Sequence, residues 1–240
     1  MKIILINQAR MTSTRLPGKV LKQVLGKPLL EYQIERLRRV KHIDCQIVAT
    51  TIHATDEPIV DLCNKLGVEC SRGSESDVLA RYYEAAVKHR PDAVVRVTSD
   101  CPLIDPDVID QVIRYYVQQA PQFEYASNVE TRTFPRGMDI EIFSYQALVN
   151  AYQLAKDPVE REHVTPYITK NLSHKGSVTY PKNHSDYRWT VDTPEDFSLI
   201  EKILSTIYPQ NPLFNLEDIL QLIAQNPHWA QINATVQQKI

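Results

Sequence analysis

The chain has 240 residues, of which 43% are hydrophobic and 23% are charged, with a formal net charge of -2 at pH 7. This length suits one large domain, or one domain with a small inserted lobe. The near-neutral charge excludes a general attraction to nucleic acids or anionic membranes. The first residues lack the long apolar core and cleavage site of a signal peptide, and no apolar stretch approaches the roughly 20 residues of a membrane helix. We therefore expect a cytoplasmic protein with no nucleic-acid or membrane partner.

Strand and helix patterns alternate over residues 1–120. Short apolar runs predict buried strands, and apolar residues spaced three and four apart predict helices. In chain order these are strand 2–8, helix 28–40, strand 45–51, helix 56–67, strand 68–72, helix 76–89, strand 92–100 and helix 105–119. Strands joined by helices pair in parallel through right-handed crossovers, and fully apolar strands need helices on both faces. The sequence thus predicts an α/β, Rossmann-like, mostly parallel sheet in three layers.

The pattern is less regular after residue 120. Strands are expected at 122–128, at 137–144, near 177–180 and up to Val191. Helices are expected near 144–155, near 159–172, after a cap at Thr193 or Asp192, and at 215–225, before a frayed tail.

The four cysteines carry no signature of a disulfide framework or a metal site. Cys45, Cys63, Cys70 and Cys101 form no C-x-x-C pair, and no histidine stands near them at the spacing of a zinc site. They are expected to be reduced thiols in or near the core.

A basic loop follows the first strand. In "NQARMTSTRLPGKVL", residues 7–21, the cations Arg10, Arg15 and Lys19 stand among small and hydroxyl residues such as Ser13. Open parallel sheets bind ligands at the carboxyl ends of their strands, and arginine and lysine side chains match phosphate oxygens. The spacing is neither that of a P-loop nor that of a dinucleotide fingerprint. We interpret this stretch as a phosphate-binding loop, with a solvated basic loop as the alternative.

Two aspartates also follow predicted strands. Asp100 ends the strand 92–100, and Asp105 is the better candidate to cap the next helix, which leaves Asp100 for chemistry. Asp192 follows the strand that ends at Val191, although D-T-P-E is also a good helix start with Asp192 as its cap. Two carboxylates at strand ends can hold Mg²⁺ together with substrate phosphates. With the basic loop beside them, they predict a nucleoside triphosphate site for phosphoryl-type displacement.

The loop resembles the signature loop of the cytidylyltransferases that activate sugars and sugar acids, including the CMP-Kdo and CMP-sialic acid synthetases. Further stretches are similar, in the same order, to segments of the SpsF-like branch of that superfamily, which serves spore coat polysaccharide synthesis. These are "RGSESDVLARY", "RVTSDCPLIDP", "FPRGMDIEIFS", "REHVTPYI" and "VDTPEDF". The resemblance spans about residues 1–205, and residues 206–240 carry none of it.

The resemblance implies a GT-A-like nucleotidyltransferase fold and a reaction in which a sugar hydroxyl attacks the α-phosphorus of CTP. The products are a CMP-sugar and pyrophosphate. Arg10, Arg15 and Lys19 match the residues that hold the triphosphate and stabilise the leaving pyrophosphate, and with Asp100 they form the expected catalytic set. The other nucleotide-binding residues that it implies are Gln8, Ala9, Ser13, Gly73, Ser74 and Asp77. Asp100 and Asp192 match carboxylates that bind Mg²⁺, the expected cofactor.

The resemblance also implies a division of labour within one nucleotidyltransferase domain. Residues 1–120 form the nucleotide-binding half, residues 121–205 the sugar-binding and dimerisation half, and residues 206–240 a helical extension. Because relatives often dimerise through the second half, we expect a homodimer.

The acceptor site is predicted in that second half. Asp139 and Glu141 share a strand face and can accept hydrogen bonds from sugar hydroxyls, with an ordinary solvent-facing strand as the alternative. Arg161 and His163 lie together early in a predicted helix. Arg161 can pair with a substrate carboxylate or phosphate, and a surface helix is the alternative.

Gln8 departs from the pattern of the sugar-acid enzymes. Those enzymes commonly carry I-P-A-R where this chain has Asn7-Gln8-Ala9-Arg10. The Gln8 amide can bind the base or the ribose, so the departure leaves the phosphate-binding cations untouched and leaves the acceptor sugar open.

Two other functions fit the same polar clusters. A GT-A glycosyltransferase that consumes a nucleotide sugar usually carries a D-x-D metal motif, whereas this strand end reads Ser99-Asp100-Cys101-Pro102. A non-catalytic nucleotide-binding subunit would keep the binding residues without turnover. Release of pyrophosphate from CTP distinguishes a cytidylyltransferase from both.

Overall fold

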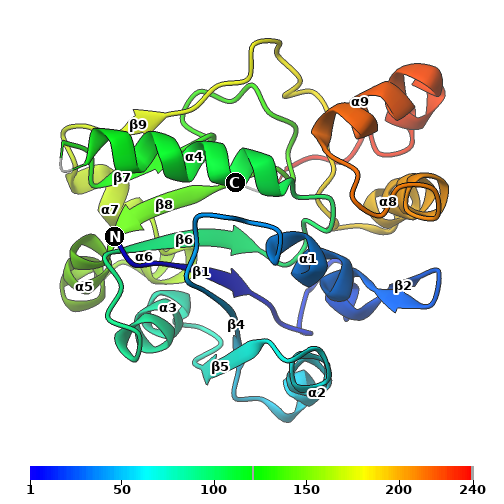
Figure 1. Cartoon of the computed structure of the whole chain (residues 1–240). Coiled ribbons are helices and arrows are strands. Elements are labelled where there is room, and N and C mark those ends of the chain that lie inside the picture. The colour runs from blue at the N-terminus through cyan, green and yellow to red at the C-terminus, as the bar shows by residue number, and fades with distance from the viewer. Residues whose placement is uncertain (121, 239–240) are drawn as a thin grey trace.

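The computed structural model describes residues 1–120 and 122–238, and Figure 1 shows a central sheet with helices on both sides. The sheet has seven strands in the order β5-β4-β1-β6-β8-β7-β9. Their bounds are Ile3–Gln8 (β1), Cys45–Thr51 (β4), Glu69–Gly73 (β5), Ala93–Thr98 (β6), Tyr125–Ser127 (β7), Glu141–Ser144 (β8) and Gly176–Ser177 (β9). The predicted three-layer α/β class is confirmed.

Four parallel strands form the first half of the sheet. β1 lies between β4 and β6 and pairs in parallel with both, and β4 pairs in parallel with β5. β8 then runs antiparallel to β6 and to β7, and β9 is parallel to β7. Because β1 and β6 are parallel neighbours, their carboxyl ends lie side by side, which brings the loop after Gln8 next to Asp100.

The helices cover both faces of this sheet. They are Leu29–Leu37 (α1), Glu57–Leu66 (α2), Val78–Val87 (α3), Pro106–Gln119 (α4), Tyr145–Leu154 (α5), Pro158–His163 (α6), Pro166–Asn171 (α7), Pro194–Ile207 (α8) and Leu216–Gln225 (α9). Alternate residues of β1 face opposite layers, as a strand's two-residue period requires. Ile3 and Leu5 pack with α1, α4, α8 and α9, whereas Ile4 and Ile6 pack with α3, α5 and α7. Figure 1 shows α4 on one side of the sheet and α3 and α5 on the other.

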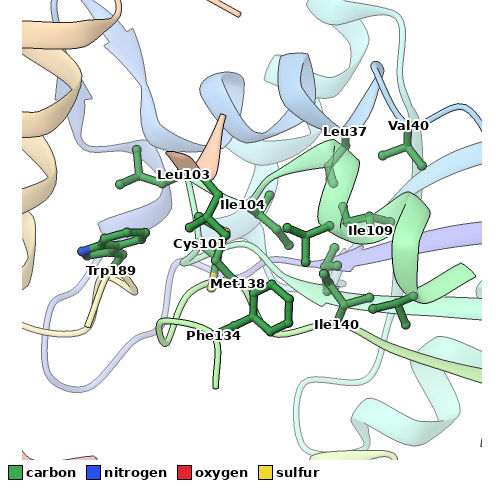
Figure 2. Close-up of a cluster of buried hydrophobic side chains, with 14 of the residues drawn as sticks. Leu37, Val40, Cys101, Leu103, Ile104, Ile109, Phe134, Met138, Ile140 and Trp189 are labelled. Atoms are coloured by element: carbon green, nitrogen blue, oxygen red, sulfur yellow. The ribbon is translucent and has the colours of Figure 1, made fainter. Parts of the chain in front are cut away.

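A buried apolar cluster includes chain neighbours of the two predicted acidic residues. Figure 2 shows Cys101, Met138 and Trp189 gathered in it, and each of them is at most 3% exposed. Cys101 follows Asp100, and Trp189 comes three residues before Asp192. Close packing leaves such side chains little room to move, so the segments that carry both carboxylates rest on a rigid core.

The single helix expected near 159–172 is wrong, because the structure has two helices, α6 and α7. They are separated at Val164, whose φ of 71° is outside the helical range. The reason is Pro166, which has no N–H to donate to the preceding turn and whose ring clashes with the carbonyl four residues before it. It becomes the first residue of α7, a position that suits proline.

The strand expected up to Val191 is also wrong. This segment makes one isolated bridge, between Arg136 and Arg188, and the Trp189 N–H donates to the Arg136 carbonyl at 2.7 Å. Gly137, at φ 100°, permits this approach, because a Cβ there would lie 2.6 Å from the Trp189 carbonyl carbon. The segment that ends at Val191 is therefore extended, but it hydrogen-bonds to the loop around Arg136 and not to the sheet. The strand expected near 177–180 is limited to Gly176–Ser177.

Several short elements fall where no element was expected. They are the 3₁₀ turns Lys19–Leu21 (η1) and Ala54–Asp56 (η2), and the two-stranded ribbon of Gln23–Val24 (β2) and Lys27–Pro28 (β3). The tail after α9 forms a 3₁₀ turn over Pro227–Gln231 (η3), and residues 239–240 of that tail lie outside the described residues.

The state of the cysteines and the lengths of the helices agree with the sequence. The four cysteines form no disulfide, and Cys63 and Cys101 are buried. Among the helices that the structure describes, none has both the length and the apolar character needed to cross a lipid bilayer.

Candidate active site

The predicted phosphate-binding loop is tied down at both ends. The Ala9 N–H donates to the Ala49 carbonyl at 3.0 Å, and the Met11 N–H donates to the buried Asp56 carboxylate at 2.8 Å. Gly18 closes the loop, with its N–H 2.9 Å from the Met11 carbonyl and a φ of 68° that glycine adopts without strain. This turn starts η1 at Lys19 and directs that side chain inward.

Lys19 joins the two acidic residues. Its Nζ lies 2.8 Å from Asp100 Oδ2 and 2.8 Å from Asp192 Oδ1. The two acidic segments are themselves held together, because the Val191 N–H donates to the Asp100 carbonyl at 2.8 Å. Burial alone would lower the pKa of Lys19, but the carboxylates of Asp100 and Asp192 outweigh it and raise that pKa. Lys19 is therefore a firmly charged bridge.

Two arginines also contact Asp192. Arg15 Nη2 lies 2.9 Å from Asp192 Oδ2, and Arg188 Nη2 lies 2.7 Å from the same oxygen. Arg188 in turn pairs with the fully buried Asp196 at 2.9 Å. With the Lys19–Asp100 pair, three cations face three carboxylates. Local charge is therefore balanced within the protein itself.

Arg10 stands apart from the other two loop cations. It is 42% exposed, and its Nη1 lies 3.5 Å from Glu75 Oε1. Glu75 also accepts a hydrogen bond from the Thr12 hydroxyl, and its Oε2 lies 3.0 Å from His53 Nε2. Two loop cations, Arg15 and Lys19, therefore contact the Asp100–Asp192 pair, whereas Arg10 contacts Glu75.

A cavity of about 440 Å³ opens over the carboxyl ends of β1 and β6. The predicted site residues that line it are Gln8, Ala9, Arg10, Ser13, Arg15, Lys19, Asp100, His163 and Asp192. It is completed by residues outside the predicted site set, namely Thr14, Val20, Val78, Arg81, Thr98, Ser99 and Glu162. The structure thus brings most of the predicted nucleotide set to one hollow.

The remaining nucleotide candidates lie at its border. Gly73 and Ser74 line a neighbouring hollow of about 710 Å³, which shares Arg10 with the main cavity. Asp77 lines neither hollow. Its Oδ1 caps α3 by accepting the Ala80 N–H at 2.9 Å, and its Oδ2 accepts from Arg161 Nε at 3.0 Å.

Most of the predicted sugar-binding side chains are held in pairs away from this cavity. Glu141 is buried, where it pairs with Arg96 and accepts from the Tyr125 hydroxyl at 2.8 Å. It therefore does not face solvent with Asp139, as the strand pattern suggested. Asp139 precedes β8 and forms a two-bond pair with Arg132, at 2.6 and 2.9 Å.

The two helix candidates for the sugar site are separated by the structure. Arg161 donates to Asp77 and, at 2.7 Å, to the Tyr152 carbonyl. His163 lines the main cavity together with Glu162. Of the four predicted sugar-binding residues, only His163 reaches the hollow that holds Lys19.

Two buried polar side chains of the cavity wall lack partners. Gln8 Oε1, and Nε and Nη1 of Arg81, make no hydrogen bond within residues 1–120 and 122–238. Arg81 is 2% exposed, and burial lowers the pKa of its guanidinium. A buried cation without a partner is costly. Arg81 therefore brings two N–H donors without an acceptor to the wall of this cavity.

The acidic pair has the donor set of a Mg²⁺ site. Asp100 and Asp192 both point at one atom, Lys19 Nζ, so their oxygens already converge on a single cationic centre. Mg²⁺ is usually bound by one or two carboxylates plus substrate phosphates. These residues therefore fit the ion. Its binding requires the Lys19 ammonium to move away from the space between the two carboxylates.

Comparison with known proteins assigns a family to the chain. A family model described as cytidylyltransferase matches residues 3–238. An uncharacterized protein of Methanocaldococcus jannaschii is 39% identical over 100% of this chain and 97% of its own length. The spore coat polysaccharide biosynthesis protein SpsF of Bacillus subtilis is 32% identical over 94% of this chain and 95% of its own length.

Solved structures agree with these sequences. A cytidylyltransferase from Leptospira borgpetersenii superposes with a TM-score of 0.91 at 34% identity, over 100% of this chain and 99% of that one. CMP:2-keto-3-deoxy-manno-octonic acid synthetase complexed with CTP gives a TM-score of 0.63 at 20% identity, over 85% of this chain and 99% of that one. The latter likeness is one of fold.

These matches correct one expectation. The sequence motifs suggested that family resemblance ends near residue 205, but the family model continues to residue 238. The structure explains this extent, because α9 packs in the same core as α4 and α8 and so belongs to the same domain.

Proposed function

Because this chain belongs to the cytidylyltransferase family, we propose that it transfers CMP from CTP to a hydroxyl of a sugar or sugar acid and releases pyrophosphate. Such a product would serve surface polysaccharide or glycan synthesis. One observation carries the proposal: Arg15 and Lys19 meet Asp100 and Asp192 in a cavity at the carboxyl ends of parallel strands. This supplies cations for a triphosphate and carboxylates for its metal ion in one place.

The cations of the loop do the electrostatic work in this proposal. Arg15 and Lys19 line the cavity, and each is mostly buried, with 25% and 12% of its side chain exposed. Such preorganised donors stabilise charge that grows on leaving phosphate oxygens without reorganising at the moment of reaction. Arg10 lines both hollows and is held beside Glu75 at 3.5 Å.

Asp100 and Asp192 would hold Mg²⁺, which when bound supplies positive charge against the phosphate oxygens. These carboxylates now share Lys19. In the loaded enzyme, Lys19 and Arg15 would both turn from the carboxylates toward the phosphates. The sugar hydroxyl, with its proton passed to solvent or a carboxylate, then displaces pyrophosphate from the α-phosphorus.

Gln8 and Arg81 suit the base end of the nucleotide. The unpaired Gln8 Oε1 can accept a hydrogen bond from the exocyclic amine of cytosine, a donor that uracil lacks. Arg81 offers donors to a carbonyl or phosphate oxygen. A polar site rejects ligands that leave its groups unpaired. We therefore expect Gln8 to make binding of CTP tighter than binding of UTP.

Replacing Arg81 with methionine is expected to weaken nucleotide binding without destabilising the free protein. The variant loses a charged hydrogen bond to the ligand, worth about 1.5–3 kcal/mol, or a roughly 10–100-fold higher Kd for CTP. It also removes a buried charge that has no partner in the free state. Calorimetric CTP titration and thermal unfolding measure the two effects.

Arg36 provides the matched control for this prediction. It is also buried, but its Nε and Nη1 donate to the Ile104 and Phe214 carbonyls at 2.7 and 3.0 Å. R36M should therefore lower the Tm, and R81M should not. Equal loss of Tm in both variants, with unchanged CTP affinity in R81M, would contradict a ligand-binding role for Arg81.

The acceptor is proposed to enter beside His163. This side chain and Glu162 line the cavity wall, and both can hydrogen-bond a sugar hydroxyl. Asp139, Glu141 and Arg161 remain candidates only if the acceptor displaces their present partners. A homodimer and a cytoplasmic location are likewise part of the proposal.

The proposal is tested by nucleotide binding followed by turnover. Thermal shifts are recorded with CTP, UTP, ATP and GTP, with and without Mg²⁺, and CTP with Mg²⁺ is expected to stabilise most. Pyrophosphate release from CTP is then measured with a panel of sugars and sugar acids. A preference for a purine nucleotide would overturn the assignment of the base.

The same assays separate the alternatives. A glycosyltransferase would consume a CMP-sugar and release no pyrophosphate from CTP. A binding subunit would be stabilised by CTP and turn over with none of the acceptors. The absence of a D-x-D motif at Asp100 already disfavours the glycosyltransferase.

A further inference from the structure

The chain after α9 returns to the active site. In Figure 1 this red segment, residues 226–238, runs from α9 back toward the centre of the molecule. It ends beside Arg188, whose Nη1 donates to Gln238 Oε1 at 2.5 Å. Arg188 contacts Asp192 through Oδ2, the oxygen that it shares with the loop cation Arg15. The C-terminal segment is thus one contact away from a proposed metal ligand.

Asp196 organises this contact. Its Oδ1 accepts from Arg188 Nε at 2.9 Å, and its Oδ2 accepts from Arg188 Nη2 at 3.1 Å. The same Oδ2 also accepts the backbone N–H groups of Asp192 and Thr193, at 3.0 and 3.1 Å. One fully buried carboxylate therefore fixes both the arginine and the backbone that present Asp192.

Asn233 completes the cluster from the C-terminal segment. Its amide Nδ2 donates to Asp196 Oδ1 at 2.8 Å and to the Arg188 carbonyl at 2.9 Å, and the side chain is 4% exposed. These bonds use both amide hydrogens. An aspartate has the same shape but neither of these donors, and it would set a second carboxylate against Asp196.

We infer that Asn233 is a positioning residue of the active site, which holds Asp192 in place through Asp196 and Arg188. The inference rests on the proposed function for its catalytic consequence, and on the hydrogen bonds above for its geometry. It gives the C-terminal segment a role in the reaction: without Asn233, the chain of contacts behind Asp192 loses its anchor. Groups that bond directly to metal ligands typically contribute about 10–100-fold to activity or metal affinity, and Asn233 acts one contact behind such a group, Arg188.

The test is Asn233→Asp, with Asn226→Asp as the matched control. Asn226 lies in the same segment, but its Nδ2 donates to the Leu222 carbonyl at 3.0 Å and takes no part in the cluster. We expect N233D to lower kcat by about 10–100-fold with little change in the KM for CTP. Hydrogen–deuterium exchange of peptides covering 186–196 should become faster. N226D should change neither quantity.

Each outcome decides the inference. Native kcat and native exchange in folded N233D would overturn it, as would equal effects in N226D. If the wild-type chain releases no pyrophosphate from CTP, the proposed function fails, while the exchange measurement still tests the hold on Asp192. If N233D does not fold, Asn233→Ser, which removes the amide without adding charge, is measured in the same two ways.

Discussion

Replacing Lys19 with methionine is expected to lower kcat by about 10²–10³-fold, or about 3–4 kcal/mol, which is the usual effect of losing one preorganised donor. The variant keeps the length of the side chain and removes its charge. In the native chain the ammonium neutralises Asp100 and Asp192 at 2.8 Å from each. Without it, the Asp100 carboxylate loses its ion pair. Steady-state pyrophosphate release measures the effect.

The same variant should acquire a metal-dependent stability. Asp192 keeps Arg15 and Arg188, but Asp100 is left without a cation beside another carboxylate, and a divalent cation would neutralise it. We therefore expect the Tm of K19M to rise more with MgCl₂ than the Tm of the native chain, whose acidic pair is already neutralised.

Lys22→Met is the control for the Lys19 variant. Lys22 lies in the same turn, but its Nζ stands 5.1 Å from the centre of the Phe197 ring and contacts neither acidic residue. Its loss should leave kcat near native. A native rate in K19M, or an equal loss in both variants, would contradict the role given to Lys19.

The parallel half of the fold could be predicted because its strands carry an unambiguous pattern. β1 and β4 are apolar runs with helices on both faces, and few other structures bury such runs. Caps added precision: Asp77 and Asp105 start α3 and α4, as their side-chain type predicts. The second half was harder, because its short strands and the extended segment before Asp192 differ in their partners and not in their pattern.

The site shows the same division. The sequence could predict that one site contains Lys19, Asp100 and Asp192. Each of them comes after a strand-like segment, and ligands bind at the carboxyl ends of parallel strands. Arg81 had a detectable signal, since a lone cation on the apolar face of a predicted helix needs a reason. Asn233 had no such signal, because its contacts join it to Arg188 and Asp196, which lie far away in the chain.

The second large effect is expected for Asp100→Asn. This variant keeps the size of the side chain and its hydrogen bond from Lys19, but it loses the charge that would bind Mg²⁺. We expect a loss of kcat of about 10²–10³-fold, comparable to the loss of another preorganised group. Asp107→Asn, an exposed position in the first turn of α4, is the control that should stay active.

The pH dependence of stability gives an independent check on Asp100. Burial alone would raise the pKa of its carboxyl, but the Lys19 ammonium outweighs this and lowers that pKa to about 2. A carboxyl whose folded pKa lies below its unfolded value of about 4 stabilises the fold above pH 4 and loses that contribution as the pH falls toward 2. D100N lacks the charge at every pH. The native chain should therefore be the more stable above pH 4, and the difference in free energy of unfolding should shrink between pH 4 and pH 2.

Denaturant unfolding of both proteins across this range measures that difference. A gap that stays constant down to pH 2 would show that Lys19 does not stabilise the ionised form of Asp100. It would also remove the reason to treat the two side chains as one charged unit. A gap that closes in this range, together with inactive D100N and active D107N, would tie the same ion pair to both the stability of the fold and the rate of the reaction.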